Sequence, residues 1–264
     1  MRRSVWLAAL LLLAALPATL PSSAGAVDLA GHRALYALSL ANSRGEISAA
    51  TGTMAFEMTD ACDGWATRQR LRITTTTRDG QDIEIGSDYA TLESKDGLSL
   101  RFTMRQTTDQ AVTSETEGEA SLPSAGAAGE ARYTRPTEGR KALPTATVMP
   151  NFHTIAIIEA ARVGKKFLTI PLFDGTSAEG AQDTSVAIFS WDGPRAHKFP
   201  ALAALPSGRV RIAFFDRDKG STTPDYELGL RYYENGVADE MNMDFGDFVM
   251  RATLQELVLL PKGC

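Results

Sequence analysis

The sequence predicts an all-β protein with one main helix, built as a single curled antiparallel sheet. Two observations carry this prediction. Apolar and polar residues alternate with a period of two along most of the chain, which is the pattern of strands with one buried and one solvated face. Asp-Gly and Asn-Gly pairs separate the alternating segments, and these pairs tolerate the positive φ angles that tight hairpins require. Polar partners at every second position are typical of antiparallel strands, because parallel strands are buried on both faces.

The first 26 residues have the features of a secretory signal peptide. Two arginines follow the initiator methionine, and residues 5–16 form an uncharged apolar run. Residues 24–26, Ala-Gly-Ala, then supply the small residues that signal peptidase requires. The apolar run is too short to span a bilayer comfortably, which disfavours an uncleaved membrane anchor. We therefore expect a cleaved signal peptide over residues 1–26 and one soluble domain over residues 27–264, located in the periplasm.

The charge of the mature chain disfavours several classes of partner. Removal of Arg2 and Arg3 with the leader takes the basic residues from 27 to 25, against 32 acidic ones, so the net charge becomes −7. Nucleic-acid binding needs a basic face, and the negative charge of the chain also argues against electrostatic docking on anionic lipid. No later segment is long and apolar enough to cross a membrane. We expect no nucleic-acid partner and no membrane span.

The alternating segments follow one another along the mature chain. Their apolar positions are, in order, Tyr36, Leu38 and Leu40; Met54, Phe56 and Met58; Leu71 and Ile73; Leu98, Leu100, Phe102 and Met104; Leu168, Ile170 and Leu172; Val186 and Ile188; Val210, Ile212 and Phe214; Tyr226, Leu228, Leu230 and Tyr232; Met241, Met243 and Phe245; Leu257 and Leu259. Asn235-Gly236 joins two of these segments directly. We therefore expect strands that are consecutive in sequence to pair as a meander.

One helix is predicted over residues 151–162. Pro150 and Asn151 mark its start, with Asn151 as the expected cap, and Gly164 marks its end. The preceding residues 121–139 are rich in Gly, Ala, Ser and Pro. We expect them to form a loop or an irregular sheet edge, and not a linker between domains, because the strand patterns on both sides have the same character.

The mature chain has two cysteines, Cys62 and Cys264. An even pair in an exported protein predicts a disulfide, and the alternative is two unpaired thiols. Closing a loop of about 200 residues would stabilise the fold by roughly 5 kcal/mol at most. A bridge at Cys264 would tie the end of the chain to an early hairpin.

A search for catalytic and cofactor motifs is negative. The chain has no Gly-x-Ser-x-Gly, no glycine loop for phosphates or dinucleotides, and no Cys-x-x-Cys. Its three histidines, His32, His153 and His197, lack metal-ligand spacing. Residues 244–246 spell the Asp-Phe-Gly triplet of kinases, but the other kinase motifs are missing, so a tight turn is the better interpretation. We expect no catalytic residue, no metal and no cofactor.

Four segments of the mature chain carry a resemblance to a known family. They are Val27–Tyr36, Ala61–Trp65, Leu230–Gly236 and Met243–Phe248. Together they resemble the EipB-like family of cell envelope integrity proteins of Gram-negative bacteria. The resemblance runs through nearly the whole mature chain and is strongest at its two ends. It implies a β-spiral or broken barrel with a helix near its opening, similar in architecture to the LolA and LolB lipoprotein carriers.

The resemblance also implies a disulfide between Cys62 and Cys264, in agreement with the pairing above. It implies a role in envelope integrity with a periplasmic tetratricopeptide-repeat protein as partner, and it supplies no catalytic residues. The leading hypothesis is therefore a non-catalytic periplasmic protein that binds or scaffolds periplasmic partners.

Two alternatives remain. A carrier could hold a lipid or an acyl chain in the curled sheet, because methionine-rich strand faces suit an adaptable apolar surface. A lipid or a lipoprotein would then be a partner. A hydrolase could assemble its site in space without a sequence motif. The sequence identifies neither a ligand nor a partner surface, and we expect any binding surface near residues 151–162 and the adjacent opening of the sheet.

Overall fold

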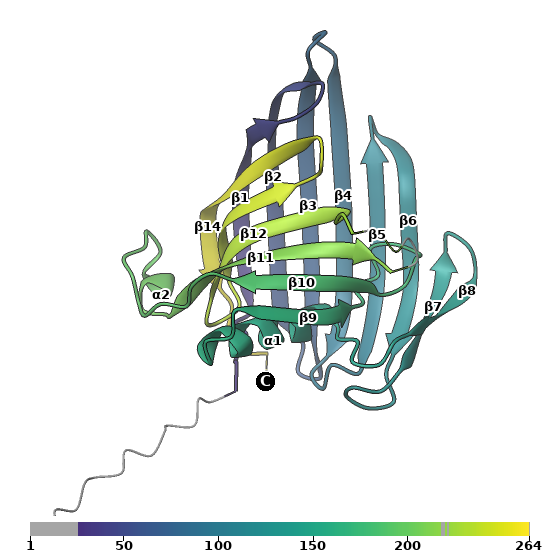
Figure 1. Cartoon of the computed structure of the whole chain (residues 1–264), viewed down its shortest axis with the longest axis vertical. Coiled ribbons are helices and arrows are strands. Elements are labelled where there is room, and N and C mark those ends of the chain that lie inside the picture. Colours follow the sequence, from purple (N-terminus) through teal and green to yellow (C-terminus); the bar gives the residue numbers. More distant parts are fainter. Residues whose placement is uncertain (1–25, 218–219, 221, 264) are drawn as a thin grey trace, which may run out of the picture.

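The computed structural model describes residues 26–217, 220 and 222–263, so the predicted signal peptide lies almost wholly outside the described residues. Within them, the chain forms one antiparallel sheet of fourteen strands and two short helices (Figure 1). The strands are β1 (His32–Ser43), β2 (Ile47–Asp60), β3 (Gly64–Thr77), β4 (Asp82–Ser94), β5 (Ser99–Thr108), β6 (Ala111–Ser121), β7 (Gly129–Arg135), β8 (Gly139–Leu143), β9 (Phe167–Leu172), β10 (Gln182–Ile188), β11 (Ser207–Asp216), β12 (Tyr226–Tyr233), β13 (Ala238–Asp244) and β14 (Phe248–Leu259). The helices are α1 (Pro150–Arg162) and α2 (Pro200–Ala203).

The sheet consists of two meanders that are joined by the first and last strands. Strands β1 to β8 pair in sequence order, strands β9 to β14 do the same, and β1 pairs with β14. His32 thereby lies opposite Leu259, more than 200 positions later in the chain. Strands β8 and β9 are the two edges, so the sheet is curled but not closed. This arrangement confirms the predicted fold class of a curled antiparallel sheet.

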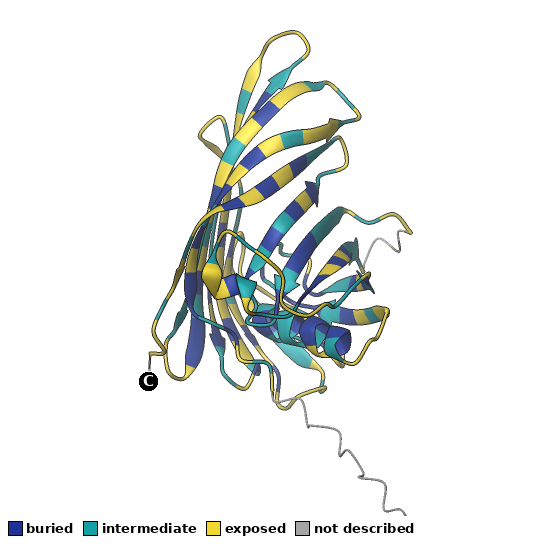
Figure 2. Ribbon diagram, turned by 90° about the vertical axis from the view of Figure 1, so that its left-hand side faces the viewer, coloured by how far each residue is buried: buried dark blue, intermediate teal, exposed yellow. Residues whose placement is uncertain are grey.

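The curl brings the two meanders face to face. In Figure 1 the long strands β1 to β6 stand behind, and β9 to β13 cross in front of them. The main core lies between these layers and draws its buried side chains from β1–β3, β10–β14 and both helices. Figure 2 shows buried and exposed residues alternating along the strands, as the period-two pattern predicts. Tyr233, Met250 and Leu254 are fully buried residues of the main core.

A second core lies under strands β5 to β8. Phe102, Tyr133 and Phe173 pack edge to face, with ring centroids 5.4 to 6.4 Å apart. Phe173 comes from the segment after β9 and not from the strands above it. That segment therefore covers the second core with an aromatic side chain.

Helix α1 begins one residue earlier than expected and has a different cap. Its N-cap is Met149, which has an extended backbone and no side-chain cap, and Pro150 occupies the first turn. Asn151 lies inside the helix and is buried, so its predicted capping role was wrong. Ile157 and Ile158 are fully buried. Gly164 has a φ of +75° just after the helix and supports the predicted end.

Residues 121–139 contain more regular structure than expected. Strand β7 lies within this range, and β8 begins at its end. Ala131 and Tyr133 of β7 are buried against the second core. The small residues of the segment thus form the sheet edge, as one of the two predicted alternatives stated, and the loop alternative was wrong for β7.

Candidate functional site

A hollow of about 970 Å³ lies on the outer face of the long strands, from β14 through β1 to β7. Its lining combines small outward-facing residues with charged side chains from the same strands. The small residues are Ala55, Ala90 and Thr103. The charged residues are Arg33, Glu57, Arg68, Arg70, Asp88, Arg105, Glu115, Glu117, Arg135 and Glu256. We call this surface the outer hollow.

Cross-strand ion pairs fix most of the charged walls of the outer hollow. Arg70 Nε contacts Asp88 Oδ1 at 2.8 Å, and these residues are register partners on β3 and β4. The Glu115 carboxylate forms ion pairs with Arg105 Nε at 3.2 Å and with Arg135 Nη1 at 2.9 Å. Exposed pairs of this kind add little stability, about 0–1 kcal/mol each, but they hold the long side chains in defined positions.

Arg68 and Glu256 are the charged residues of this wall that make no ion pair with a described residue. Arg68 is exposed and lies opposite Glu57 on one side and Ala90 on the other. Glu57 is already paired with Arg33, and Arg68 makes no ion pair with any described residue. Its guanidinium therefore remains available to a carboxylate or phosphate of a bound molecule.

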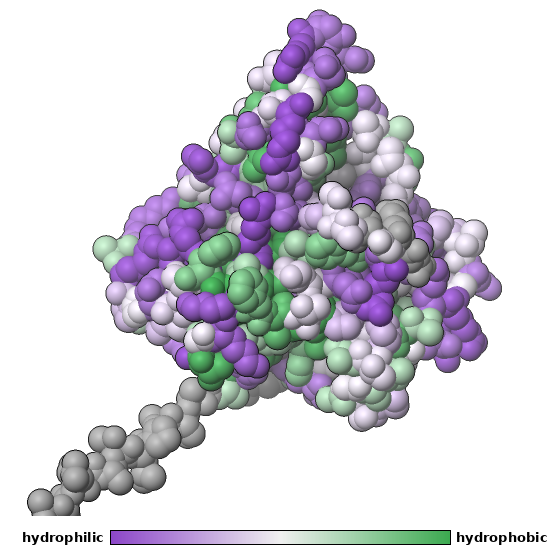
Figure 3. Space-filling view, in the orientation of Figure 1, coloured by the Kyte–Doolittle hydropathy of each residue, from purple (hydrophilic) through white to green (hydrophobic). Residues whose placement is uncertain are grey.

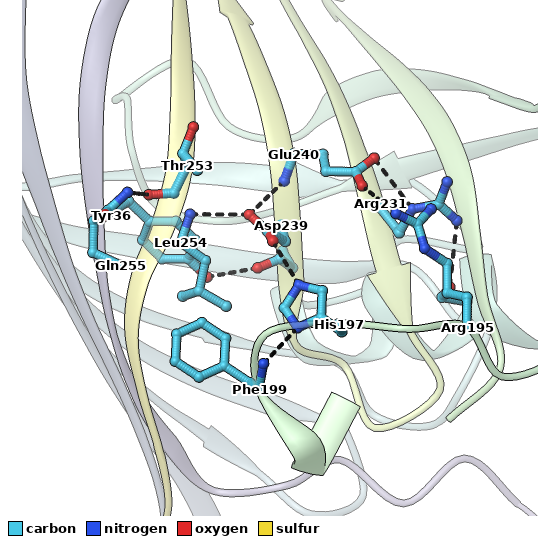
Figure 4. A network of polar contacts seen from close by, with 12 residues as sticks. Tyr36, Arg195, His197, Phe199, Arg231, Asp239, Glu240, Thr253, Leu254 and Gln255 are labelled. Carbon is cyan, nitrogen blue, oxygen red and sulfur yellow. Dashed lines mark hydrogen bonds and ion pairs between the residues drawn. The ribbon is translucent and has the colours of Figure 1, made fainter. Parts of the chain in front are cut away.

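A buried polar network fastens the segment before α2 to the sheet (Figure 4). His197 Nε2 lies 3.1 Å from Asp239 Oδ2, and His197 Nδ1 accepts the backbone N–H of Phe199 at 3.1 Å. Asp239 Oδ1 also accepts the backbone N–H groups of Glu240 at 2.7 Å and of Leu254 at 2.9 Å. These contacts tie the segment around His197 to β13 and β14.

The geometry of this network engages both ring nitrogens of His197. Because His197 Nδ1 accepts a hydrogen bond, the ring proton is on Nε2, which donates to Asp239. Both ring nitrogens are therefore occupied, and neither is free to take a proton from a nucleophile. Next to it, Glu240 contacts Arg231 at 3.2 Å and Arg195 at 2.8 Å. Burial alone would raise the pKa of Glu240, but the surrounding guanidinium groups outweigh it and lower the pKa.

Glu93 of β4 occupies the N-terminus of α1. Its side chain is completely buried and accepts the backbone N–H groups of Asn151 at 2.7 Å and of Phe152 at 3.2 Å. It satisfies two of the free donors of the first turn and places a negative charge at the positive end of the helix dipole. Burial raises the pKa of Glu93 to about 7, although these hydrogen bonds pull it downward. The helix is thus capped from a distant strand.

The three histidines are held apart by the fold. His32 Nδ1 donates to the carbonyl of Ala30 at 2.7 Å, and His153 Nε2 donates to Thr184 Oγ1 at 2.8 Å. Burial lowers the pKa of His153 to about 4, so it is neutral. Among the residues that the structure describes, no group of three His, Cys, Asp or Glu side chains could hold a metal ion.

Cys62 lies in the turn between β2 and β3 and has a φ of +66°. The end of the described chain passes this turn: the backbone N–H of Leu260 donates to Gly31, and a Cβ on Gly263 would meet the carbonyl oxygen of Asp60 at 2.1 Å. Cys264 lies outside the described residues, so the pairing of Cys62 with Cys264 stays a prediction.

The sequence did not indicate the outer hollow. We expected a binding surface near α1, but α1 contributes no residue to this hollow. Ala55 and Ala90 lie 35 positions apart in sequence, and only the register of β2, β3 and β4 brings them onto one surface. Within the described part of the chain, no helix is long and apolar enough to cross a membrane.

Three comparisons place these features among known proteins. The model of the EipB-like family matches residues 23–261. The cell envelope integrity protein EipB of Brucella abortus (strain 2308) is 30% identical over 251 residues, which cover 92% of this chain and 88% of the relative. A crystal structure from Brucella abortus, described as a beta-barrel-like protein of a domain of unknown function, matches with a TM-score of 0.80 and 28% identity. That match covers 89% of this chain and 100% of the other.

Proposed function

Since the chain belongs to the EipB-like family, we propose that it is a non-catalytic periplasmic protein that supports the integrity of the cell envelope by binding protein partners. The name of its Brucella relative supports the envelope role. The predicted signal peptide supports a location in the periplasm. The occupied ring nitrogens of His197 support a non-catalytic protein, because this buried histidine–carboxylate pair has no free position for proton transfer.

The outer hollow is the observation that carries the binding role. A stable protein interface needs a preformed surface whose polar groups are held in place. The ion pairs of Arg70 with Asp88 and of Arg105 with Glu115 hold such groups across neighbouring strands. Arg68 offers an unpaired cation among them. The partner that fits is a protein with an acidic side chain at its contact surface, and the tetratricopeptide-repeat protein implied for the family is our candidate.

Filling the outer hollow tests this proposal. Ala90 faces outward in the hollow and contributes no side chain to the core clusters. Ala90→Arg should therefore leave the fold intact and remove partner capture in pull-downs from envelope extracts. Thr253→Arg is the matched control, because Thr253 is exposed on β14, carries the same added charge and lies outside the hollow.

A deletion strain provides the second readout. The unmodified gene and the Thr253→Arg gene should restore resistance to detergents, and the Ala90→Arg gene should not. If Ala90→Arg is folded, captures the same partner and restores resistance fully, the outer hollow is not the binding surface.

A lipid or acyl carrier is the second candidate, and one cluster favours it. Phe214, Tyr226, Phe245 and Phe248 form a chain of ring contacts with centroid separations of 5.6, 5.4 and 5.1 Å. All four are only partly buried where they pack against the main core. A partly buried aromatic row of this kind could take up an acyl chain.

Native mass spectrometry of periplasmic protein and titration with a fluorescent fatty acid test the carrier role. Phe245→Asp should abolish fatty-acid binding, because it places a charge in the aromatic row. Asn242→Asp is the control, since Asn242 is exposed on β13 and adds the same charge. An empty protein with no affinity for the fatty acid would remove this candidate.

A further inference from the structure

Three large apolar side chains are exposed where α1 ends and β9 and β10 meet. Val163, Phe167 and Phe189 keep 70%, 78% and 64% of their surface accessible to solvent. Exposed phenylalanine side chains that gather on one surface indicate a contact with another apolar phase. Figure 3 shows hydrophobic side chains gathered on the face over this region. We call these three residues the apolar patch.

The register of the sheet places the two phenylalanines together. Phe167 is the register partner of Ala187, and the backbone N–H of Ile188 donates to Lys166 at 2.8 Å. Phe189 follows two positions after Ala187, so it points to the same face of the sheet. The two rings are therefore diagonal neighbours on adjoining strands, and diagonal neighbours lie about 7–8 Å apart.

Two lysines flank the apolar patch without an acidic partner. Lys165 and Lys166 are exposed and make no ion pair with any described residue. The other cations of this region are neutralised, since Arg162 contacts Glu234 at 2.6 Å and Arg209 pairs with Glu240. Glu159 is the only acidic residue between positions 150 and 173. An apolar patch beside free positive charge results, on a chain whose net charge is negative.

From this juxtaposition we propose that the apolar patch and its two lysines dock the protein on the surface of an anionic phospholipid bilayer. Phenylalanine side chains insert among the acyl chains near the headgroups, and lysines reach the lipid phosphates. The net negative charge of the chain does not prevent this contact, because charges farther than about 8 Å from the surface are screened at physiological salt. The site is separate from the outer hollow and does not depend on it.

Sedimentation with lipid vesicles tests the docking. The protein should sediment with vesicles of equal parts phosphatidylglycerol and phosphatidylcholine, and less with phosphatidylcholine alone. Phe167→Ser combined with Phe189→Ser should weaken binding at least tenfold, and so should Lys165→Glu combined with Lys166→Glu. The pair Leu92→Ser and Val112→Ser is the matched control, because both residues are exposed apolar side chains outside the patch, 42% and 46% accessible.

The outcomes distinguish a lipid bilayer from a second copy of the chain as the partner of the apolar patch. Unchanged vesicle binding by both patch variants, or no binding of the unmodified protein to anionic vesicles, would overturn the proposal. A dimer in light scattering that becomes a monomer in the phenylalanine variant, without vesicle binding, would instead assign the patch to a second copy of the chain. Circular dichroism checks that each variant is folded. Partner capture through Ala90 is measured separately, so failure here leaves the proposed function unaffected.

Discussion

The Glu93 carboxylate on β4 accepts the backbone N–H of Asn151 at 2.7 Å and so caps a helix that lies 57 residues later in the chain. The N-cap residue Met149 makes no side-chain hydrogen bond to the first turn of the helix, so the cap comes from the distant Glu93. The carboxylate is completely buried, and its pKa is raised to about 7. Burial of this carboxyl group, which its hydrogen bonds to the helix only partly offset, makes the stability of the fold dependent on pH.

Ionisation of Glu93 should lower the free energy of unfolding as the pH rises. The pKa of Glu93 is raised by burial from 4.5 to about 7, so the folded state binds the proton more tightly than the unfolded state. The stabilisation that the protonated Glu93 contributes is fully present below pH 4.5 and is lost as the pH rises through 7. Relative to Glu93→Gln, the unmodified protein should lose roughly 3 kcal/mol of unfolding free energy across this range, at about 1.4 kcal/mol per pKa unit. Urea unfolding at a series of pH values measures the difference.

The comparison with Glu93→Gln also removes the effect of His153. The pKa of His153 is lowered by burial to about 4, so its contribution has the opposite sign and is lost as the pH falls below 6.5. Both proteins contain His153, and its effect cancels. Glu84→Gln, an exposed change on the same strand, should leave the pH profile of the unmodified protein in place. Parallel profiles for Glu93→Gln and the unmodified protein would contradict the prediction.

Replacing Asp239 with asparagine should loosen the segment around His197. Oδ1 can keep its two backbone hydrogen bonds, but the new NH₂ group would face the Nε2–H of His197, and two donors cannot pair. We expect a loss of about 1–3 kcal/mol in urea unfolding and faster proteolysis between residues 190 and 199. Asp247→Asn, in an exposed turn, should cost less than about 0.5 kcal/mol. Equal stability of the two variants would argue against a structural role for the network.

Cys62→Ser should lower the melting temperature and speed hydrogen exchange in β14, if Cys62 and Cys264 are bridged. A bridge restricts the unfolded chain, and a loop of this length gives roughly 5 kcal/mol at most. Reductant should lower the melting temperature of the unmodified protein by a similar amount and leave Cys62→Ser unchanged. Two thiols that titrate freely in the native protein would disprove the pairing.

Phe173→Ala should cost about 3–5 kcal/mol, because the ring is fully buried against Phe102 and Tyr133. Phe167→Ala removes the same side chain from an exposed position, where 78% of its surface is accessible, and should change stability by less than about 0.5 kcal/mol. Thermal or urea unfolding measures both. Similar losses at the two positions would mean that the segment after β9 does not close the second core.

The sequence predicts those features that depend on local chemistry. Alternation identified the strands, and the hairpin between β12 and β13 was correctly placed at Asn235-Gly236, where Gly236 has a φ of +84°. Pro150 and Gly164 bracketed α1 to within a residue. Each of these signals lies inside the element that it marks, so no knowledge of the tertiary structure is needed.

The features that escaped prediction depend on register and on distant partners. Nothing near Asn151 shows that Glu93 takes over the capping role. The outer hollow requires Arg70 to stand beside Asp88, which follows only from the pairing of β3 with β4. The apolar patch joins Phe167 and Phe189 across β9 and β10 in the same way. Single-sequence patterns show which residues share a face of one strand, but not which strands share a surface.

The pairing of β1 with β14 also sets the order in which the molecule can be completed. A chain emerges from the ribosome with its N-terminal part first, so β1 can pair with β2 early but lacks its second neighbour until the last strand arrives. Contacts between residues so far apart in sequence form slowly. Throughout that interval the backbone donors and acceptors along one side of β1 are open to other chains, which is a hazard for aggregation. The newly made chain thus exposes an unpaired edge for longest at the strand that is made first.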